Sequence, residues 1–328
     1  MIQDGRFTVV VCLLAMVVAL APSQACAAEK IVSGHMWESQ TAQHRALVWA
    51  AQEVERRFSG RYHMDVFPKG QLGNTDAELA EGLHNGTTDV SFFNVGHAAT
   101  VYPPISIGGA PFLFRDFAHW DAYRRSSLFE ELKAGFEKVA GLKVFGLTYY
   151  GERHITSKKP IRDLEDLKGL VIRVPNKPTL LTMFRALGAK PVAVPFNETF
   201  QALKEGLVEA EENPLPTIRS MRFHEVTPII TLTGHISDGE MIVMSARRWS
   251  AVPDSDRAVL SEIFSETTDL VTAEVRKEEL TLVSTFQEEG IVVNEIDRKT
   301  LAEALEPVLR GGAFPWSVEL YDRVRSLR

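Results

Sequence analysis

The stretch Gly169-Leu170-Val171-Ile172-Arg173-Val174-Pro175-Asn176 sets an arginine inside a short apolar run. The run from Leu170 to Val174 predicts a strand, because branched apolar residues dominate it and Pro175 cannot extend a backbone ladder. Residues 177–187 follow with a helical pattern, and Gly188 ends them. A strand followed directly by a helix is the unit from which parallel sheets covered by helices are built.

The same alternation continues on both sides of this unit, from the N-terminal region to about residue 250. It predicts strands at residues 31–33, 62–67, 90–93 and 142–149, and helices at residues 41–57 and 76–84. Thr75 stands where the second helix needs an N-cap, and Gly86 follows its end. We therefore predict an α/β fold with mostly parallel sheets. The length of 328 residues suits two domains.

The pattern changes after Pro253. Residues 254–289 contain neither glycine nor proline. About 36 residues at roughly 1.5 Å each give a helix of roughly 54 Å, which is longer than one ordinary domain is wide. Two interpretations stay open at this point: a single helix lying across two lobes, or two helices separated by a bend.

The N-terminus has the pattern of a secretory signal peptide. An apolar run covers residues 7–21, and Ala25-Cys26-Ala27 offers small residues for cleavage after Ala27 or Ala28. The run is too short for a comfortable membrane span. Both cysteines, Cys12 and Cys26, lie in this leader, so the mature chain would contain no disulfide. Lipidation of Cys26 is the alternative, although no apolar residue stands three places before it.

Composition and motifs exclude several classes of protein. The formal net charge is −7 and no Lys/Arg-rich run occurs, so nucleic acid is not an expected partner. The sequence lacks the G-x-S-x-G, G-x-x-x-x-G-K-[ST], H-E-x-x-H and dinucleotide-binding glycine patterns. Its nine histidines show no metal-ligand spacing. We expect no catalytic residues, no metal and no cofactor.

Several motifs in order resemble the solute receptors of TRAP transporters, the DctP-type family. They are the 169–176 strand, Glu212-Asn213-Pro214, Arg153 with Ser157-Lys158-Lys159-Pro160-Ile161, Gly70-Gln71-Leu72-Gly73 and Pro111-Phe112-Leu113-Phe114. Arg153 lies twenty residues before Arg173, and Asn213 lies forty residues after it. The similarity extends from about Lys30 to the C-terminal helix. One position departs from the family pattern, because Glu211 stands where these receptors usually carry glutamine.

The resemblance implies a two-lobed periplasmic binding protein fold, with hinge strands and a long helix spanning both lobes. Lobe I would comprise residues 28–150 and 239–278, and lobe II residues 151–238 and 279–328. The protein would be a periplasmic monomer that binds a small organic acid between the lobes. It would deliver this acid to the integral membrane subunits of the transporter.

Three residues carry the binding prediction. Arginine presents a planar fork that can hold a carboxylate through two parallel hydrogen bonds. By resemblance, Arg173 would form this fork, Arg153 would add a second cationic contact, and Asn213 would donate to the same carboxylate. Each has a structural alternative: Arg173 an exposed strand residue or an ion pair, Arg153 a hinge-surface arginine, and Asn213 an Asn-Pro turn.

Six further residues are candidates for ligand contacts: Asn94, Phe196, Asn176, Trp37, Glu240 and Glu38. Asn94 ends a predicted strand, where ligands of α/β lobes usually bind, and could equally cap the next helix. Asn176 has the same two possibilities. Phe196 and Trp37 could form cleft walls or fill the core. The two glutamates could accept hydrogen bonds from ligand hydroxyls or belong to the solvated surface.

Two other functions stay open from the sequence. One is a ligand-sensing partner of a receptor kinase, and the other is a periplasmic enzyme on a similar scaffold. The sequence does not distinguish C4-dicarboxylates, sugar acids, 2-oxo acids and small aromatic acids as ligands.

Overall fold

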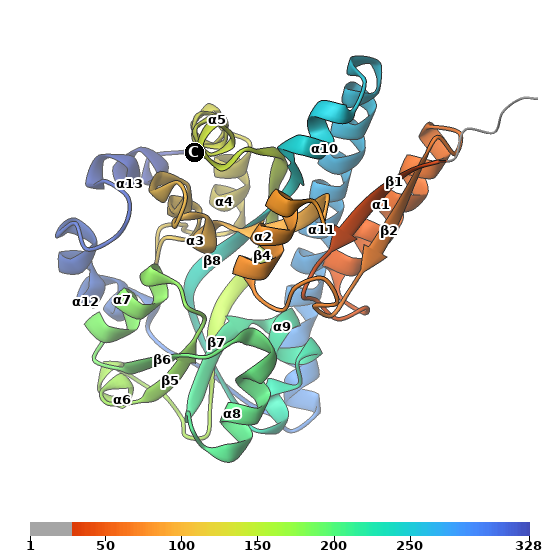
Figure 1. Cartoon of the computed structure of the whole chain (residues 1–328). Helices are drawn as coiled ribbons and strands as arrows, with labels where there is room; N and C mark the ends of the chain where they lie inside the picture. Colours follow the sequence, from red (N-terminus) through yellow and green to blue (C-terminus); the bar gives the residue numbers. More distant parts are fainter. Residues whose placement is uncertain (1–27) are drawn as a thin grey trace, which may run out of the picture.

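A computed structural model describes residues 28–328 of the chain (Figure 1). The predicted signal peptide, Cys12 and Cys26 lie outside the described residues. Within them, a mixed sheet has the strand order β2-β1-β3-β8-β4-β7-β5-β6, with β9 (Val292–Glu295) beside β8. The predicted α/β class is therefore confirmed, and the sheet is the frame that positions every candidate site residue.

The first strand group lies at one end of the sheet. It comprises β1 (Glu29–Gly34), β2 (Tyr62–Phe67) and β3 (Val90–Asn94), which pair in parallel and alternate with α1 (Ala42–Arg57) and α2 (Asp76–Asn85). The predicted N-cap Thr75 accepts from the Glu78 N–H, and α1 starts one residue later than predicted, because Thr41 is its N-cap and accepts from the His44 N–H. Gly86 ends α2 with a φ of 86°, a conformation that glycine adopts without strain.

The second strand group lies at the other end. It comprises β5 (Val171–Val174), β6 (Lys190–Ala193) and β7 (Ala210–Pro214), also parallel, with α7 (Pro178–Ala186), α8 (Thr199–Glu205) and α9 (Leu215–Ser220). The arginine-bearing strand and the helix after it therefore form as the sequence predicts.

Two long antiparallel strands join the groups. They are β4 (Leu142–Ser157) and β8 (Ile229–Ser245), which pair along most of their length. The prediction of mostly parallel sheets thus holds within each group but not at the centre. The predicted strand 142–149 was too short, because β4 continues through Gly151, whose φ of 127° permits a register shift beside Tyr149. A strand that crosses from one group to the other has no signal in its local pattern.

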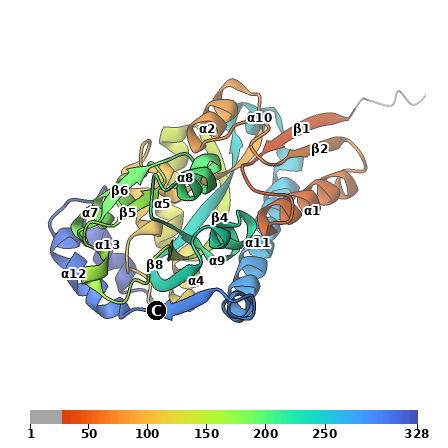
Figure 2. The same cartoon turned by 90° about the horizontal axis from the view of Figure 1, so that it is seen from below.

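One unbroken helix, α11 (Asp254–Glu288), decides between the two interpretations of the region after Pro253. It has 35 residues and packs against β4, α1, α9 and β9 (Figures 1 and 2). Ion pairs connect it to both strand groups: Arg45 of α1 contacts Glu274 and Glu278 in the second half of the helix, and Arg219 of α9 contacts Glu289 just after it. The prediction of a single helix in contact with both strand groups is confirmed.

The remaining elements cover the faces and edges of the sheet. They are α3 (Val95–Ala98), η1 (Pro103–Gly109), α4 (Phe117–Arg124), α5 (Ser127–Ala140), α6 (Leu164–Leu167), η2 (Phe196–Glu198), η3 (Phe223–Glu225), α10 (Ala246–Ala251), α12 (Arg298–Arg310) and α13 (Val318–Arg325). The two C-terminal helices contact different parts of the molecule. Helix α12 packs on α7 and β8, whereas α13 packs on η1 and Arg323 pairs with Glu131 of α5.

A buried glutamate connects α11 to β4. Glu279 Oε1 accepts hydrogen bonds from the Glu152 N–H and the Tyr149 O–H. Burial is the largest effect and raises the pKa of Glu279 to about 7. Because this pKa is raised in the folded state, the carboxyl destabilises the fold increasingly as the pH rises from about 4.5 to about 7.

We expect Glu279→Gln to gain stability relative to the parent protein as the pH rises. The amide stays neutral and keeps an oxygen for both donors, so the gain between pH 5 and pH 8 should be on the order of 1–3 kcal/mol. Urea unfolding of both proteins at the two pH values measures it. An equal difference in unfolding free energy at pH 5 and pH 8 would contradict the raised pKa.

Candidate functional site

A cavity opens where the two strand groups meet. Its lining residues are Met36, Trp37, Asp76, Asn94, Tyr150, Arg153, Arg173, Pro175, Lys177, Phe196, Asn213 and Glu240. They come from both strand groups and from the crossing strands β4 and β8. Seven of the nine residues that the sequence predicted for ligand binding are in this lining, and Asn176 and Glu38 are not.

Arg173 is buried in the second strand group, with 1% of its surface exposed. Its Nε and Nη2 donate to the Val194 carbonyl oxygen at 3.0 and 2.8 Å, which fixes the plane of the guanidinium. Within residues 28–328 no carboxylate lies within 4.0 Å of it, and its Nη1 makes no hydrogen bond. Burial lowers the pKa of Arg173 to about 10, so the side chain is still cationic at neutral pH. It is therefore neither an exposed strand residue nor an ion-pair partner.

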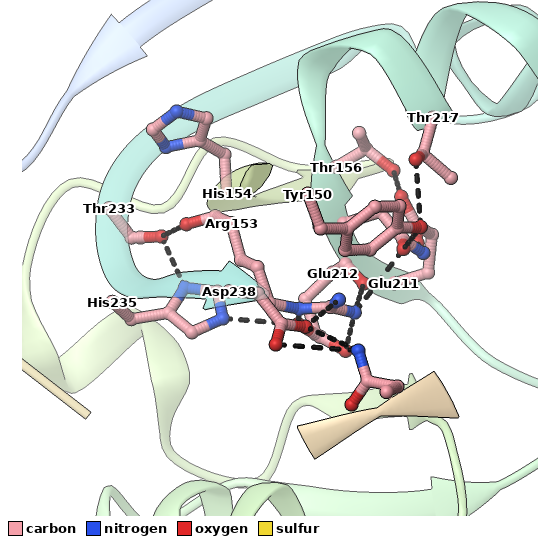
Figure 3. A network of polar contacts seen from close by, with 12 residues as sticks. Tyr150, Arg153, His154, Thr156, Glu211, Glu212, Thr217, Thr233, His235 and Asp238 are labelled. Atoms are coloured by element: carbon pink, nitrogen blue, oxygen red, sulfur yellow. Dashed lines mark hydrogen bonds and ion pairs between the residues drawn. The ribbon is translucent and has the colours of Figure 1, made fainter. Parts of the chain in front are cut away.

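Arg153, by contrast, has its charge neutralised inside the protein (Figure 3). Its Nε and Nη2 donate to the Glu212 carboxylate, and its Nη1 donates to Asp238 Oδ2 at 3.0 Å. The side chain is 2% exposed, so the alternative of a hinge-surface arginine is wrong. Burial opposes its charge, but the two carboxylates outweigh burial and raise the pKa of Arg153. Arg153 lines the cavity with its hydrogen-bonding edges already occupied.

Sequence reasoning missed the partners of Arg153. Glu212 Oε2 lies 3.1 Å from His235 Nε2, and His235 Nδ1 lies 2.7 Å from Thr233 Oγ1. Burial favours the neutral form of Glu212, yet Arg153 and His235 hold its pKa at about 2. No local signal could have found this cluster, because His235 on β8 and Arg153 on β4 are more than 80 residues apart in the chain.

Asn213 forms hydrogen bonds both with Arg153 and with Glu211, the residue opposite Arg173 in the sheet. Its Nδ2 donates to Glu211 Oε2 at 2.7 Å, and its Oδ1 accepts from Arg153 Nη2 and from the Tyr150 O–H at 3.2 and 3.3 Å. It lies within strand β7 rather than in a turn, since β7 extends to Pro214. One amide hydrogen of Asn213 is left for a ligand at the cavity wall.

The wall formed by β8 is acidic, and β3 lies beside it. Glu240 is 2% exposed, and its Oε2 has no hydrogen-bond partner among the described residues. Burial, followed by the nearby Asp238, raises the pKa of Glu240 well above its usual range. Asn94 lies where both predicted roles are possible. Its side chain accepts from the Gly96 N–H at 2.8 Å and so caps α3, and the residue also lines the cavity.

Aromatic rings close another side of the cavity. The ring of Trp37 lies 5.0 Å from that of Tyr150 and 5.3 Å from that of Phe196. Trp37 is 7% exposed, so it both packs in the core and faces the cavity. Because Trp37 follows β1 and Phe196 follows β6, this contact connects the two strand groups.

Two predicted residues lie elsewhere. Glu38 forms an ion pair with Lys69 at the surface, and Asn176 is exposed beside the start of α7. Asn176 does not cap α7, because Lys177 occupies the N-cap position. Within residues 28–328, no cluster of three His, Cys, Asp or Glu side chains is arranged to hold a metal ion.

A buried arginine that lines a cavity between the two strand groups can hold a carboxylate. Comparison with protein families agrees, since residues 33–313 match the family model "Bacterial extracellular solute-binding protein, family 7". The chain belongs to the DctP family. The resemblance predicted from the sequence motifs is therefore confirmed, and the protein is a solute-binding receptor.

Known members resemble the chain along nearly its whole length. The sialic acid-binding periplasmic protein SiaP of Vibrio cholerae is 28% identical over 297 residues, which are 90% of this chain and 92% of SiaP. A TRAP periplasmic solute-binding protein of Bordetella bronchiseptica, with density assigned to pantoate, has a TM-score of 0.87 at 26% identity. The match covers 92% of this chain and 99% of that one.

A third relative comes from a Sulfitobacter species and has α-D-taluronate bound. It is 28% identical with a TM-score of 0.83, and the match covers 90% of this chain and 97% of that one. These neighbours confirm the two-lobed fold, and the family places the DctP protein in the periplasm. Between residues 28 and 328, none of the helices has the length and apolar character that a membrane span needs.

The paired state of Arg153 makes a testable contribution to stability. Glu212→Gln should lower the free energy of unfolding by about 3–5 kcal/mol, because it removes the charge that compensates a buried guanidinium. Glu225→Gln is the matched control, since Glu225 pairs with Arg222 at the exposed surface and its loss should change little. Urea unfolding measures both variants. Equal effects would mean that the buried pair contributes no more than the exposed one.

Proposed function

We propose that this DctP protein captures a small organic acid by its carboxylate, between the two strand groups, with Arg173 as the principal contact. The observation that carries the proposal is the buried Arg173 guanidinium, which has no ion-pair partner within the described part of the chain. Arg173 lines the cavity, and the orientation of its guanidinium is already fixed by Val194. A ligand carboxylate would supply the missing charge through two parallel hydrogen bonds.

Asn213 would donate its remaining amide hydrogen to the same carboxylate, while Arg153 would act mainly by holding Asn213 and Asp238 in place. Trp37 and Phe196 would pack against the ligand, and Asn94 and Glu240 would contact its polar end. The Vibrio relative is a sialic acid-binding protein, the Bordetella structure has density assigned to pantoate, and the Sulfitobacter structure has taluronate bound. All three compounds are carboxylic acids. They support an acid as the ligand class.

We further propose that the receptor delivers the bound acid to a membrane transporter. The receptor would be exported by its signal peptide, act as a monomer without any chemical step, and dock on the integral membrane subunits of a TRAP transporter. Lobe I (28–150 and 239–278) and lobe II (151–238 and 279–328) would close over the ligand by bending at β4 and β8. The register shift at Tyr149–Gly151 supports a hinge there, although the contacts of α13 tie the C-terminus to the first lobe as well.

A thermal-shift screen tests the ligand class. Sodium salts of N-acetylneuraminate, pantoate, D-galacturonate and succinate are compared with neutral glucose and galactose on the mature protein. An acid at 100 times its Kd should add about 2.7 kcal/mol of stability. Stabilisation by a neutral sugar and by none of the acids would refute a carboxylate ligand.

Arg173→Lys should weaken binding of the acid that gives the largest shift by at least about tenfold, which corresponds to about 1.4 kcal/mol. Lysine keeps the charge but cannot donate to Val194 and to both carboxylate oxygens at once. Titration calorimetry measures the change, with Arg222→Lys at the exposed surface as the matched control. Binding within about twofold of the parent protein would remove Arg173 from the site.

A further inference from the structure

Glu211 is a buried acid next to the proposed carboxylate site. It occupies strand β7 opposite Arg173 of β5 in the parallel register, and no part of it is exposed to solvent. Among the described residues, no basic nitrogen lies within 4.0 Å of its carboxyl group. Its protonation state must therefore be inferred from its hydrogen bonds.

The hydroxyl groups around Glu211 allow a count of hydrogens. Three oxygen–oxygen contacts form a chain: Glu211 Oε1 to Thr156 Oγ1 at 3.1 Å, Thr156 Oγ1 to Thr227 Oγ1 at 2.8 Å, and Thr227 Oγ1 to the Phe223 carbonyl at 2.7 Å. Three hydrogen bonds need three hydrogens. The two threonines supply one each, and a carbonyl supplies none. If the Thr227 hydroxyl donates to the Phe223 carbonyl, the third hydrogen belongs to Glu211.

The direction of each bond follows from this count. Thr227 donates to the Phe223 carbonyl, because that oxygen can only accept. Thr156 then donates to Thr227, and Glu211 donates to Thr156. The other carboxyl oxygen, Oε2, accepts from Asn213 Nδ2 at 2.7 Å, as the carbonyl oxygen of a neutral acid would. Figure 3 shows Thr156, Glu211 and Glu212 in this part of the network.

The charges around Glu211 agree with a neutral acid. Burial is the largest effect and raises its pKa to about 7, against the opposing hydrogen bond from Asn213. Glu212 on the same strand raises it further, while Arg173 on β5 and Arg153 on β4 lower it. The charge of Arg153 has a smaller effect on the pKa of Glu211, because Glu212 and Asp238 already neutralise that charge.

We propose that Glu211 is held as a neutral carboxylic acid and that its proton is linked to capture of the ligand carboxylate at Arg173. The link rests on the proposed function. An ionised Glu211 would place a second anion against Arg173 and Asn213, the groups that a ligand carboxylate needs, and two adjacent carboxylates favour retention of one proton. Above the pH at which Glu211 ionises, an anionic ligand therefore binds together with one proton from the solvent.

Infrared difference spectra between the parent protein and Glu211→Gln test the first half without any ligand. At pH 6 the parent should show a C=O stretch of a protonated carboxylic acid that the variant lacks, and this band should vanish by pH 9. Absence of such a band at pH 6 would overturn the proposal. Glu279→Gln, which removes a different buried acid, identifies the signal of that group separately.

Thr227→Val tests the direction of the hydrogen bonds. It removes the acceptor of the Thr156 hydrogen, which then becomes free to donate to Glu211 and stabilise the ionised form. The Phe223 carbonyl keeps a donor, since it also accepts from the Thr227 backbone N–H at 3.0 Å. The infrared midpoint of Glu211 should move to lower pH. An unchanged midpoint would refute the proton count.

Titration calorimetry tests the link to binding, with the acid of the screening panel that stabilises the parent most. Between pH 7 and pH 9 the affinity should fall by at least about tenfold, since one linked proton changes affinity by up to tenfold per pH unit. At pH 8 the apparent enthalpy should differ between phosphate and Tris buffers. Glu211→Gln should bind with nearly constant affinity across this range and with no buffer dependence.

The outcomes separate the two proposals. A parent protein that binds an acid with pH-independent affinity, or a Glu211→Gln variant with the parent's pH dependence, would refute the proton link and leave the carboxylate receptor standing. If no acid of the panel stabilised the parent protein, the proposed ligand class and the link to its binding would both fail. The infrared spectra would still decide whether Glu211 carries a proton.

Discussion

The antiparallel pairing of β4 with β8 is the constraint on which the rest of the structure depends. These two strands are the connection in the sheet between two parallel strand groups that would otherwise be separate α/β units. They also position the cavity, because Tyr150 and Arg153 lie on β4 while Asp238 and Glu240 lie on β8. Helix α11 lies along β4 and holds this crossing from outside the sheet.

The distribution of charge around the cavity follows from where counter-ions are available. Arg153 finds Glu212 and Asp238 on the neighbouring strands, so its burial is compensated within the protein. Among residues 28–328, the side chain of Arg173 donates only to a backbone carbonyl, and the acid opposite it in the sheet register is Glu211. A buried cation without a carboxylate partner is unfavourable until a ligand supplies one, which is the arrangement that a receptor for anions requires.

Glu211 gives this receptor a property that glutamine at the same place would not. A neutral acid can donate to Thr156 and accept from Asn213, as a glutamine amide also can, but it can lose its proton. Glutamine could form the same two hydrogen bonds, whereas only glutamate would make the charge next to Arg173 dependent on pH.

The sequence by itself determined several of the elements and the family. Periodicity and caps predicted β2 and the start of α2 at Asp76, since these depend on neighbours within a few residues. Motif order predicted the family, and seven of nine proposed contacts reached the cavity. Only the tertiary structure decided that Arg153 is neutralised, that Glu38 and Asn176 lie outside the cavity, and that α11 is unbroken. These features depend on burial and on partners from distant strands, and such pairings leave no periodic trace in the chain.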